Sequence, residues 1–233
     1  MKVTYTIMAL LAATALLLSA AKFLPAIPLS LHGNAFANNL LKYQLFAVVV
    51  AGAALLLTLA YTPESRVLLR FGNMETIAAK EQWLGINGKS TWRANGLQLL
   101  LFISLATGVF MFLAVKYTGS LNNFNWQFVP LVILISLANS FSEEILYRFA
   151  INGNLTGHAS KTIVFVVSAV LFGLPHYAGF PNGIAGVIMA GVLGYILSKA
   201  TYETQGLGLA WGIHFVQDLI IITAIFMMKY ANG

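Results

Sequence analysis

The chain has 233 residues, of which 59% are apolar and 9% charged, and its mean hydropathy is +0.81. Soluble domains average about 45–50% apolar and about 25% charged residues, so the composition indicates an integral membrane protein. The formal net charge is +6, but the basic residues stand singly between apolar stretches, which argues against a nucleic-acid surface. The sequence contains no cysteine, and this excludes disulfides and a cysteine nucleophile.

Seven apolar stretches follow one another, and most reach the roughly 20 residues that a helix needs to cross a bilayer. They lack the strict alternation of barrel strands, so helices are the remaining way to pair every backbone group in lipid. The predicted fold is all-α, a polytopic transmembrane bundle forming a single domain over residues 1–233. The stretches cover residues 5–24, 43–61, 96–117, 126–151, 162–177, 183–199 and 207–228.

The first apolar stretch and the polar connection after the second one set the expected topology. Residues 5–24 follow Lys2 and end near small residues, a pattern that is also typical of a cleaved signal peptide. The long polar connection, residues 62–95, is rich in lysine and arginine, and the positive-inside rule places it in the cytoplasm. Counting spans outward then gives a cytoplasmic N-terminus and an external C-terminus.

Two features of the sixth stretch predict local contacts. Small residues recur every four positions over residues 183–194, which lets two helix backbones approach closely in lipid. Lys199 and Glu203 lie four residues apart next to a connection, and we expect them to form an ion pair at the surface.

Ionisable side chains also occur inside three of the apolar stretches. A charge at the centre of a membrane helix costs roughly 2.5–3.5 kcal/mol, so each such group needs a partner or a watery cavity. The chain therefore has an unusual polar set within its spans. Its members are Glu143, Glu144 and Arg148 on the fourth stretch, His176 on the fifth, and His214 and Asp218 on the seventh.

Helical spacing predicts how the acidic residues of the fourth stretch are used. Glu144 and Arg148 are four residues apart with the acid first, so they should form an ion pair. Glu143 is rotated by about 100° from Glu144 and points to another part of the bundle. An unpaired carboxylate there requires water, a metal ion or a proton.

The histidines come from two other helices. His214 and Asp218 share one helix face, while His176 follows Gly173 and Pro175, which loosen the fifth stretch. Three helices can thus aim polar groups into one cavity. Counting helical rise puts His176 about 22 Å along its stretch but His214 only about 10 Å, so the two meet only if the fifth stretch tilts or begins below the membrane surface.

The three groups of residues together resemble the ordered motifs of the CPBP family. These are intramembrane proteases related to the type II CAAX-processing endopeptidases and to bacteriocin-processing, Abi-like and immunity proteins. The resemblance covers roughly residues 128–228, so residues 126–228 are expected to form the CPBP-like catalytic core, with helices and a cytoplasmic loop in residues 1–95. The matching segments are Glu143-Glu144-x3-Arg148, Phe172-x3-His176 and His214-x3-Asp218.

The resemblance implies an endopeptidase in which Glu143 activates the attacking water and His214 helps to hold it. His176 would polarise the scissile carbonyl or stabilise its oxyanion, Glu144 would brace the site with Arg148, and Asp218 would orient His214 or bind a metal. Phe172 is expected to support the site. Zinc is a candidate cofactor, and a metal-free glutamate mechanism fits the same residues. The candidate zinc ligands are Glu143, His176, His214 and Asp218.

The resemblance also implies a setting and a substrate class. The expected protein is a multi-pass component of a bacterial inner membrane that acts on membrane-embedded or lipid-anchored peptides or proteins. Two other functions stay open: a non-catalytic immunity or scaffold protein that keeps the polar cluster for packing, and a proton-coupled transporter, because intramembrane Glu, His and Asp also form proton relays.

Overall fold

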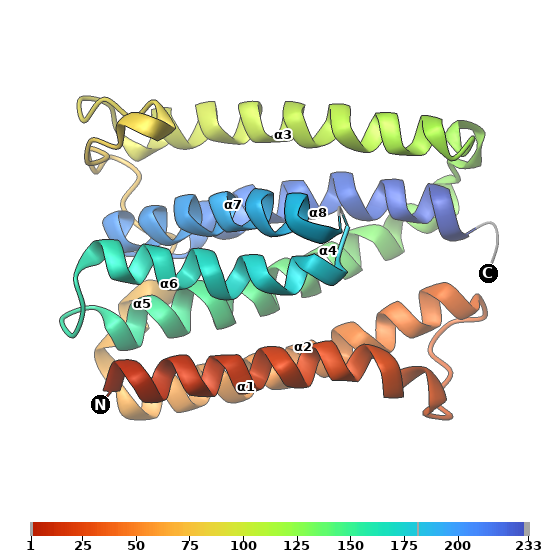
Figure 1. Ribbon diagram of the computed structural model, residues 1–233, viewed down its shortest axis with the longest axis horizontal. Helices are drawn as coiled ribbons and strands as arrows, with labels where there is room; N and C mark the ends of the chain where they lie inside the picture. The colour runs from red at the N-terminus through yellow and green to blue at the C-terminus, as the bar shows by residue number, and fades with distance from the viewer. Residues whose placement is uncertain (1, 181, 231–233) are drawn as a thin grey trace.

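The computed structural model describes residues 2–180 and 182–230, and this part of the chain is a bundle of eight α-helices without strands (Figure 1). Seven segments are long and apolar enough to cross a membrane, which confirms the predicted all-α membrane fold. One of these spans combines α4 and α5 through a π-helical turn, η6 (Ile145–Phe149). The helices are α1 (Lys2–Phe23), α2 (Ala35–Tyr61), α3 (Trp92–Tyr117), α4 (Val129–Glu144), α5 (Ala150–Leu155), α6 (Lys161–Gly173), α7 (Gly183–Thr204) and α8 (Gly208–Lys229).

Polar capping residues set the start of several helices. Asn34 accepts a hydrogen bond from the backbone N–H of Ala37, so α2 begins well before the apolar run that predicted it. The first turns of α2 contain asparagine and lysine, and for this reason hydropathy alone missed them. Thr91 and Ser160 cap α3 and α6 in the same way.

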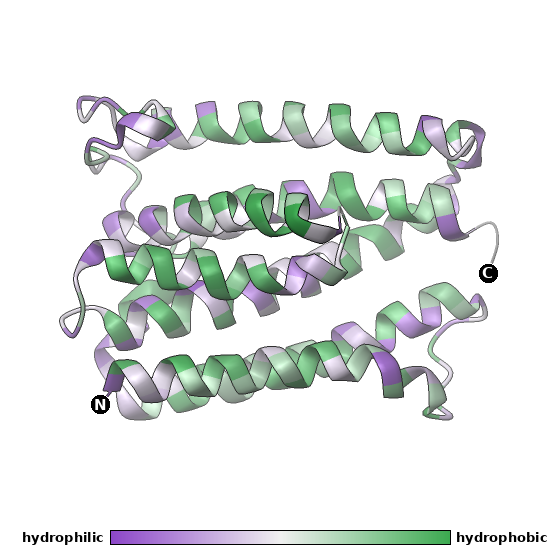
Figure 2. Ribbon diagram, in the orientation of Figure 1, coloured by the Kyte–Doolittle hydropathy of each residue, from purple (hydrophilic) through white to green (hydrophobic). Residues whose placement is uncertain are grey.

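Hydrophobic residues lie along the helices, while hydrophilic residues gather at the connections and in the middle of the bundle (Figure 2). Large apolar side chains point outward from the spans, including Phe102, which is 71% exposed, and Leu56, which is 69% exposed. Such an outer surface is stable in lipid and not in water. The chain is therefore an integral membrane protein.

The polar connection between α2 and α3 lies at the same end of the bundle as the N-terminus, and the C-terminus lies at the other end (Figure 1). This connection covers the expected ion pair of α7. Lys199 Nζ lies 2.6 Å from Glu203 Oε1 and 3.9 Å from an oxygen of Glu81, and the Lys199 side chain is only 2% exposed. The pair was expected at the surface; it is buried because Glu203 also accepts hydrogen bonds from Ala79 N and Trp92 Nε1.

Helices α6 and α7 pack backbone to backbone, as the small residues of α7 predicted. A Cβ atom on Gly194 would lie 3.1 Å from Ala169 Cα, and one on Gly173 would lie 2.7 Å from the carbonyl oxygen of Val187. Both obstacles are backbone atoms, which cannot swing aside. The contact holds the α6 end that carries two of the candidate site residues.

We predict that Gly173→Ala lowers the free energy of unfolding by about 1–3 kcal/mol, because the added methyl group overpacks this contact. The measurement is thermal unfolding in detergent followed by circular dichroism. Gly52→Ala on α2 is the matched control, since a Cβ there meets no atom within 4 Å. Equal unfolding temperatures for Gly173→Ala and the wild-type protein would contradict the prediction.

Candidate active site

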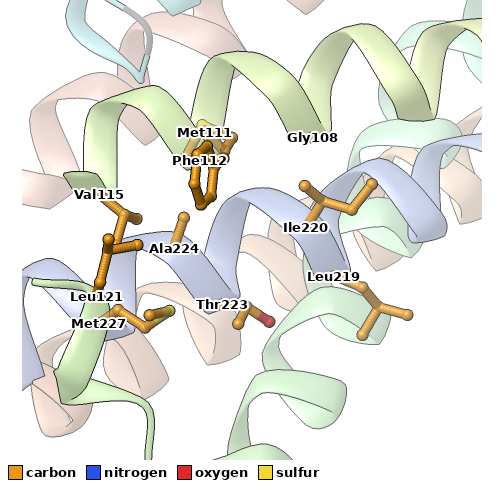
Figure 3. Close-up of a pocket in the computed structure, with 10 residues that line it drawn as sticks. All are labelled: Gly108, Met111, Phe112, Val115, Leu121, Leu219, Ile220, Thr223, Ala224 and Met227. Atoms are coloured by element: carbon orange, nitrogen blue, oxygen red, sulfur yellow. The ribbon is translucent and has the colours of Figure 1, made fainter. Parts of the chain in front are cut away.

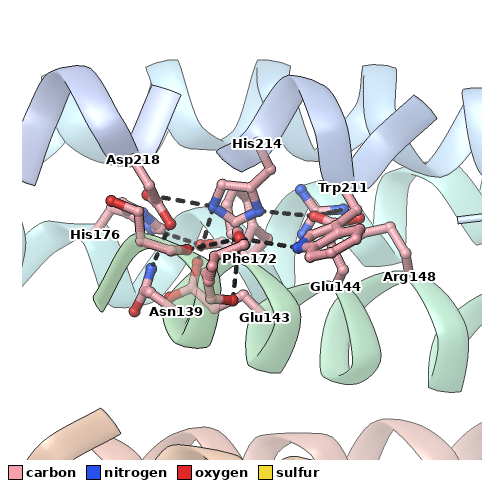
Figure 4. A network of polar contacts seen from close by, with 12 residues as sticks. Asn139, Glu143, Glu144, Arg148, Phe172, His176, Trp211, His214 and Asp218 are labelled. Atoms are coloured by element: carbon pink, nitrogen blue, oxygen red, sulfur yellow. Dashed lines mark hydrogen bonds and ion pairs between the residues drawn. The ribbon is translucent and has the colours of Figure 1, made fainter. Parts of the chain in front are cut away.

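Three helical segments bring the predicted polar residues into one network in the middle of the bundle (Figure 4). Glu143 and Glu144 end α4 and Arg148 lies in η6; Phe172 belongs to α6; His176 lies in the 3₁₀-helix η7 (Leu174–Ala178). The remaining members, His214 and Asp218, lie on α8. The sequence placed these residues on separate spans, and the packing of α4, α6 and α8 makes them neighbours.

His214 occupies the centre of the network. Its Nδ1 lies 2.8 Å from Glu144 Oε1, and its Nε2 lies 3.3 Å from Glu143 Oε2 and 3.7 Å from Asp218 Oδ1. The adjacent carboxylates of α4 therefore reach opposite sides of one ring, which follows from the turn between neighbouring helical residues. With acceptors at both nitrogens, His214 can donate hydrogen bonds from both.

The predicted Glu144–Arg148 pair is present and fully buried. Arg148 Nε lies 3.3 Å from Glu144 Oε1, with side-chain exposures of 0% and 2%. The Arg148 guanidinium carbon also lies 4.0 Å from the ring centroid of Phe172, a cation–π contact. Its nitrogens make no hydrogen bond to any residue in the described ranges, so the positive charge of Arg148 is stabilised by its contacts with Glu144 and Phe172.

A π-helical turn begins immediately after Glu144. A regular α-helix was expected through Arg148, whereas η6 widens the helix and buries all five of its residues. Such turns are rare and occur often at functional sites. The turn is held from outside, since Tyr147 OH is hydrogen-bonded to Thr14 of α1 and Tyr147 O accepts from Ser168.

Phe172 contacts both His176 and His214, although these histidines lie at different distances along their apolar stretches. Its ring centroid lies 4.8 Å from that of His176 and 5.4 Å from that of His214. Phe172 therefore lies beside His214, and His176 follows one turn later. The C-terminal end of α6 and the start of α7 lie short of the ends of α3 and α8, so the turn that follows α6 lies inside the length of the bundle (Figure 1).

The backbone contact of His176 fixes the donor role of one ring nitrogen. His176 Nδ1 lies 2.8 Å from the carbonyl oxygen of Phe172. A carbonyl only accepts, so Nδ1 carries the hydrogen, and Nε2 of the neutral ring is an acceptor. His176 is thus better suited to accept a hydrogen bond from water than to donate one to an oxyanion.

The sequence reasoning missed two polar residues beside the site. Asn139 of α4 donates from Nδ2 to Asp218 Oδ2 at 3.1 Å, and its Oδ1 accepts from Gln44 Nε2 of α2 at 3.1 Å. One signal for Asn139 was available: it is an amide within an apolar stretch, four residues before Glu143 and hence on the same helix face. Gln44 had no comparable signal.

The four candidate zinc ligands do not form a metal site in this arrangement. Within residues 2–180 and 182–230, no group of three or more His, Asp or Glu side chains is placed to hold one ion. Both ring nitrogens of His214 face carboxylates.

An apolar pocket of about 380 Å³ lies between α3 and α8 (Figure 3). Its lining residues on α8 begin at Leu219 and continue toward the C-terminal end of this helix. The other lining residues are Gly108, Met111, Phe112, Val115, Leu121, Ile220, Thr223, Ala224 and Met227.

Comparison with known proteins gave one family match. Residues 125–220 match the family model described as type II CAAX prenyl endopeptidase Rce1-like. The match covers a little under half of the chain and contains all three motifs, so the resemblance drawn from them is confirmed for this segment. Neither the curated proteins nor the solved structures gave a match.

We predict that Arg148→Ala lowers the free energy of unfolding by about 3–5 kcal/mol, because it leaves Glu144 as a buried charge without its cation. The measurement is thermal unfolding in detergent. Adding Glu144→Gln to this variant should recover part of the loss by removing the stranded charge.

Arg93→Ala is the control, since its ion pair with Glu75 is exposed, with side-chain exposures of 73% and 61%, and exposed pairs contribute little. Equal unfolding temperatures for Arg148→Ala and Arg93→Ala would show that the buried pair does not stabilise the bundle.

Proposed function

We propose that this chain, whose residues 125–220 form an Rce1-like segment, is an intramembrane endopeptidase that hydrolyses membrane-embedded or lipid-anchored substrates. The observation that carries the proposal is the placement of Glu143 beside His214 in the middle of an apolar bundle. Hydrolysis inside a membrane requires a base and a polar place for water, and this cluster offers both.

Exposure distinguishes the two adjacent carboxylates. The Glu143 side chain is 23% exposed, whereas that of Glu144 is 2% exposed and is engaged by Arg148 and by Nδ1 of His214. Glu143 is therefore the more accessible of the two carboxylates. Glu144 instead holds His214 in place from the buried side.

In the proposed reaction Glu143 takes a proton from water as the water oxygen bonds to the scissile carbonyl carbon. The carbonyl oxygen becomes an oxyanion, and Nε2–H of His214 faces the site as a donor for it. His176 accepts the second hydrogen bond of the water through Nε2. Glu143 then returns its proton to the leaving nitrogen, and the carbon–nitrogen bond breaks. The two histidines thus exchange the roles that the family resemblance implied.

The pocket between α3 and α8 supports a substrate with an apolar chain. It is lined mostly by aliphatic and aromatic side chains and has a volume of about 380 Å³. The matched family model is named for prenyl endopeptidases. We assign this pocket to the isoprenoid chain of a prenylated peptide.

We predict that Glu143→Gln abolishes cleavage while the protein stays folded, because the amide cannot take the proton of water. Loss of a general base lowers rates by about 10²–10⁴-fold. The assay uses purified protein in nanodiscs with a library of farnesylated and unlipidated peptides, read by mass spectrometry. Glu75→Gln, in the exposed connection, is the matched control and should cleave normally.

A parallel arm adds a zinc chelator, and we expect cleavage to continue. Activity that is lost on chelation and returns with zinc would assign the chemistry to a metal. Normal turnover by Glu143→Gln would overturn the proposed base. Absence of cleavage by the wild-type protein throughout the library would favour a non-catalytic role.

We further predict that Gly108→Leu raises KM for farnesylated peptides by about 10-fold and leaves KM for unlipidated peptides unchanged. Gly108 lines the pocket and a Cβ there meets no atom within 4 Å, so a larger side chain can extend from this position into the pocket. Losing a few buried methylene groups of the isoprenoid, at about 0.8 kcal/mol each, accounts for this change. Equal KM values for both peptide classes would remove the pocket from substrate binding.

A further inference from the structure

We propose that Asn139, held by Gln44 of α2, is a positioning residue that fixes the carboxylate of Asp218 beside His214. The inference rests on the proposed function for its catalytic consequence. Its structural basis is a continuous chain of side-chain contacts from α2 through α4 to α8, which lies outside the three sequence motifs.

The donor and acceptor groups of the side chains fix the direction of each hydrogen bond from Gln44 through Asn139 to Asp218. An ionised Asp218 only accepts, so the Asn139 NH₂ group must face it, at 3.1 Å. The Asn139 carbonyl oxygen then faces Gln44, which must present its own NH₂ group, also at 3.1 Å. Each amide has one orientation that satisfies its neighbour, and a flip of either would place two donors or two acceptors together.

The two carboxylate oxygens of Asp218 make different contacts. Oδ2 accepts from Asn139, while Oδ1 lies 3.7 Å from His214 Nε2. The same Nε2 lies 3.3 Å from Glu143 Oε2. Asn139 therefore sets the rotation of the Asp218 carboxylate and keeps one acceptor beside the nitrogen that faces the proposed base.

The contact also offsets crowding of negative charge. Glu143, Glu144 and Asp218 all approach His214, and like charges this close repel each other strongly in a low-dielectric interior. The Asn139 amide points its positive end at Asp218 and adds no charge. An aspartate at position 139 would have the same shape and would lack that donor.

Gln44 gives the N-terminal helices a part in the site. It is 6% exposed, and its Nε2 reaches Asn139 across the α2–α4 contact. Residues 1–95 thus contribute more than a scaffold around the matched segment. Loss of Gln44 frees the Asn139 amide to rotate. Gln44→Leu is therefore expected to lower kcat, but by less than substitution of Asn139 does.

The first test follows catalysis. Asn139→Leu and Asn139→Asp should each lower kcat by about 10–100-fold, the range for partners that orient catalytic groups, with KM changed by less than about twofold. The reciprocal variant Asn139→Asp/Asp218→Asn restores a donor–acceptor pair with its direction reversed. It should recover at least about tenfold in kcat over Asn139→Asp, which a purely structural role would not produce.

The second test does not depend on activity. Protein labelled with ¹⁵N-histidine in nanodiscs gives ring signals, and those of His214 are identified by their loss in His214→Gln. Asn139→Leu should shift the His214 Nε2 signal and leave those of His32 and His158 in place. Gln217→Leu is the matched control, because it removes a buried amide that donates to Ser104 of α3; its His214 signal should match the wild type.

The outcomes separate the two proposals. An unshifted His214 signal in Asn139→Leu, or a shift as large in Gln217→Leu, would overturn the positioning role whatever the activity. A shifted signal with unchanged kcat would show that the contact exists and does not serve the reaction. If the wild-type protein cleaves no peptide, the proposed function fails, and the histidine signals still decide whether Asn139 positions Asp218 and His214.

Discussion

The buried contact of His214 with Glu143 and Glu144 is the interaction on which the site depends. Charges in hydrocarbon are stable only with partners, and here one imidazole and one guanidinium offset three carboxylates. Glu144 belongs to both pairs, because it accepts from His214 and lies against Arg148. This sharing ties α4, η6 and α8 together and leaves Glu143 as the carboxylate with access.

Two departures from regular helices place other residues around that contact. The π-turn after Glu144 buries Arg148 under the ring of Phe172, and α6 ends early so that His176 lies inside the bundle. Each departure is supported from outside, the first by Thr14 on Tyr147 and the second by the close α6–α7 contact at Gly173. The irregular backbone therefore lies where other helices cover it, as a membrane interior requires.

The parts of the chain outside the matched segment also shape the protein. Helix α2 reaches the site through Gln44, and α3 forms one wall of the apolar pocket. The connection between them closes one end of the bundle over Lys199 and Glu203. The polar network, the apolar pocket between α3 and α8 and the covered end of the bundle thus all include residues from outside the matched segment.

The sequence by itself determined the membrane class, the seven spans and the Glu144–Arg148 pair, because hydropathy and the spacing of four residues depend only on neighbours along the chain. It also indicated Glu143, His176, His214 and Asp218 as ionisable groups in apolar stretches.

Only the tertiary structure decided which of these groups meet. The position of His214 between two carboxylates and the contact of Gln44 with Asn139 depend on how separate helices pack. The burial of Lys199 likewise depends on a loop more than 100 residues earlier in the sequence. Helical periodicity fixes the face of each side chain, and the partner that face meets is set by the packing of the whole bundle.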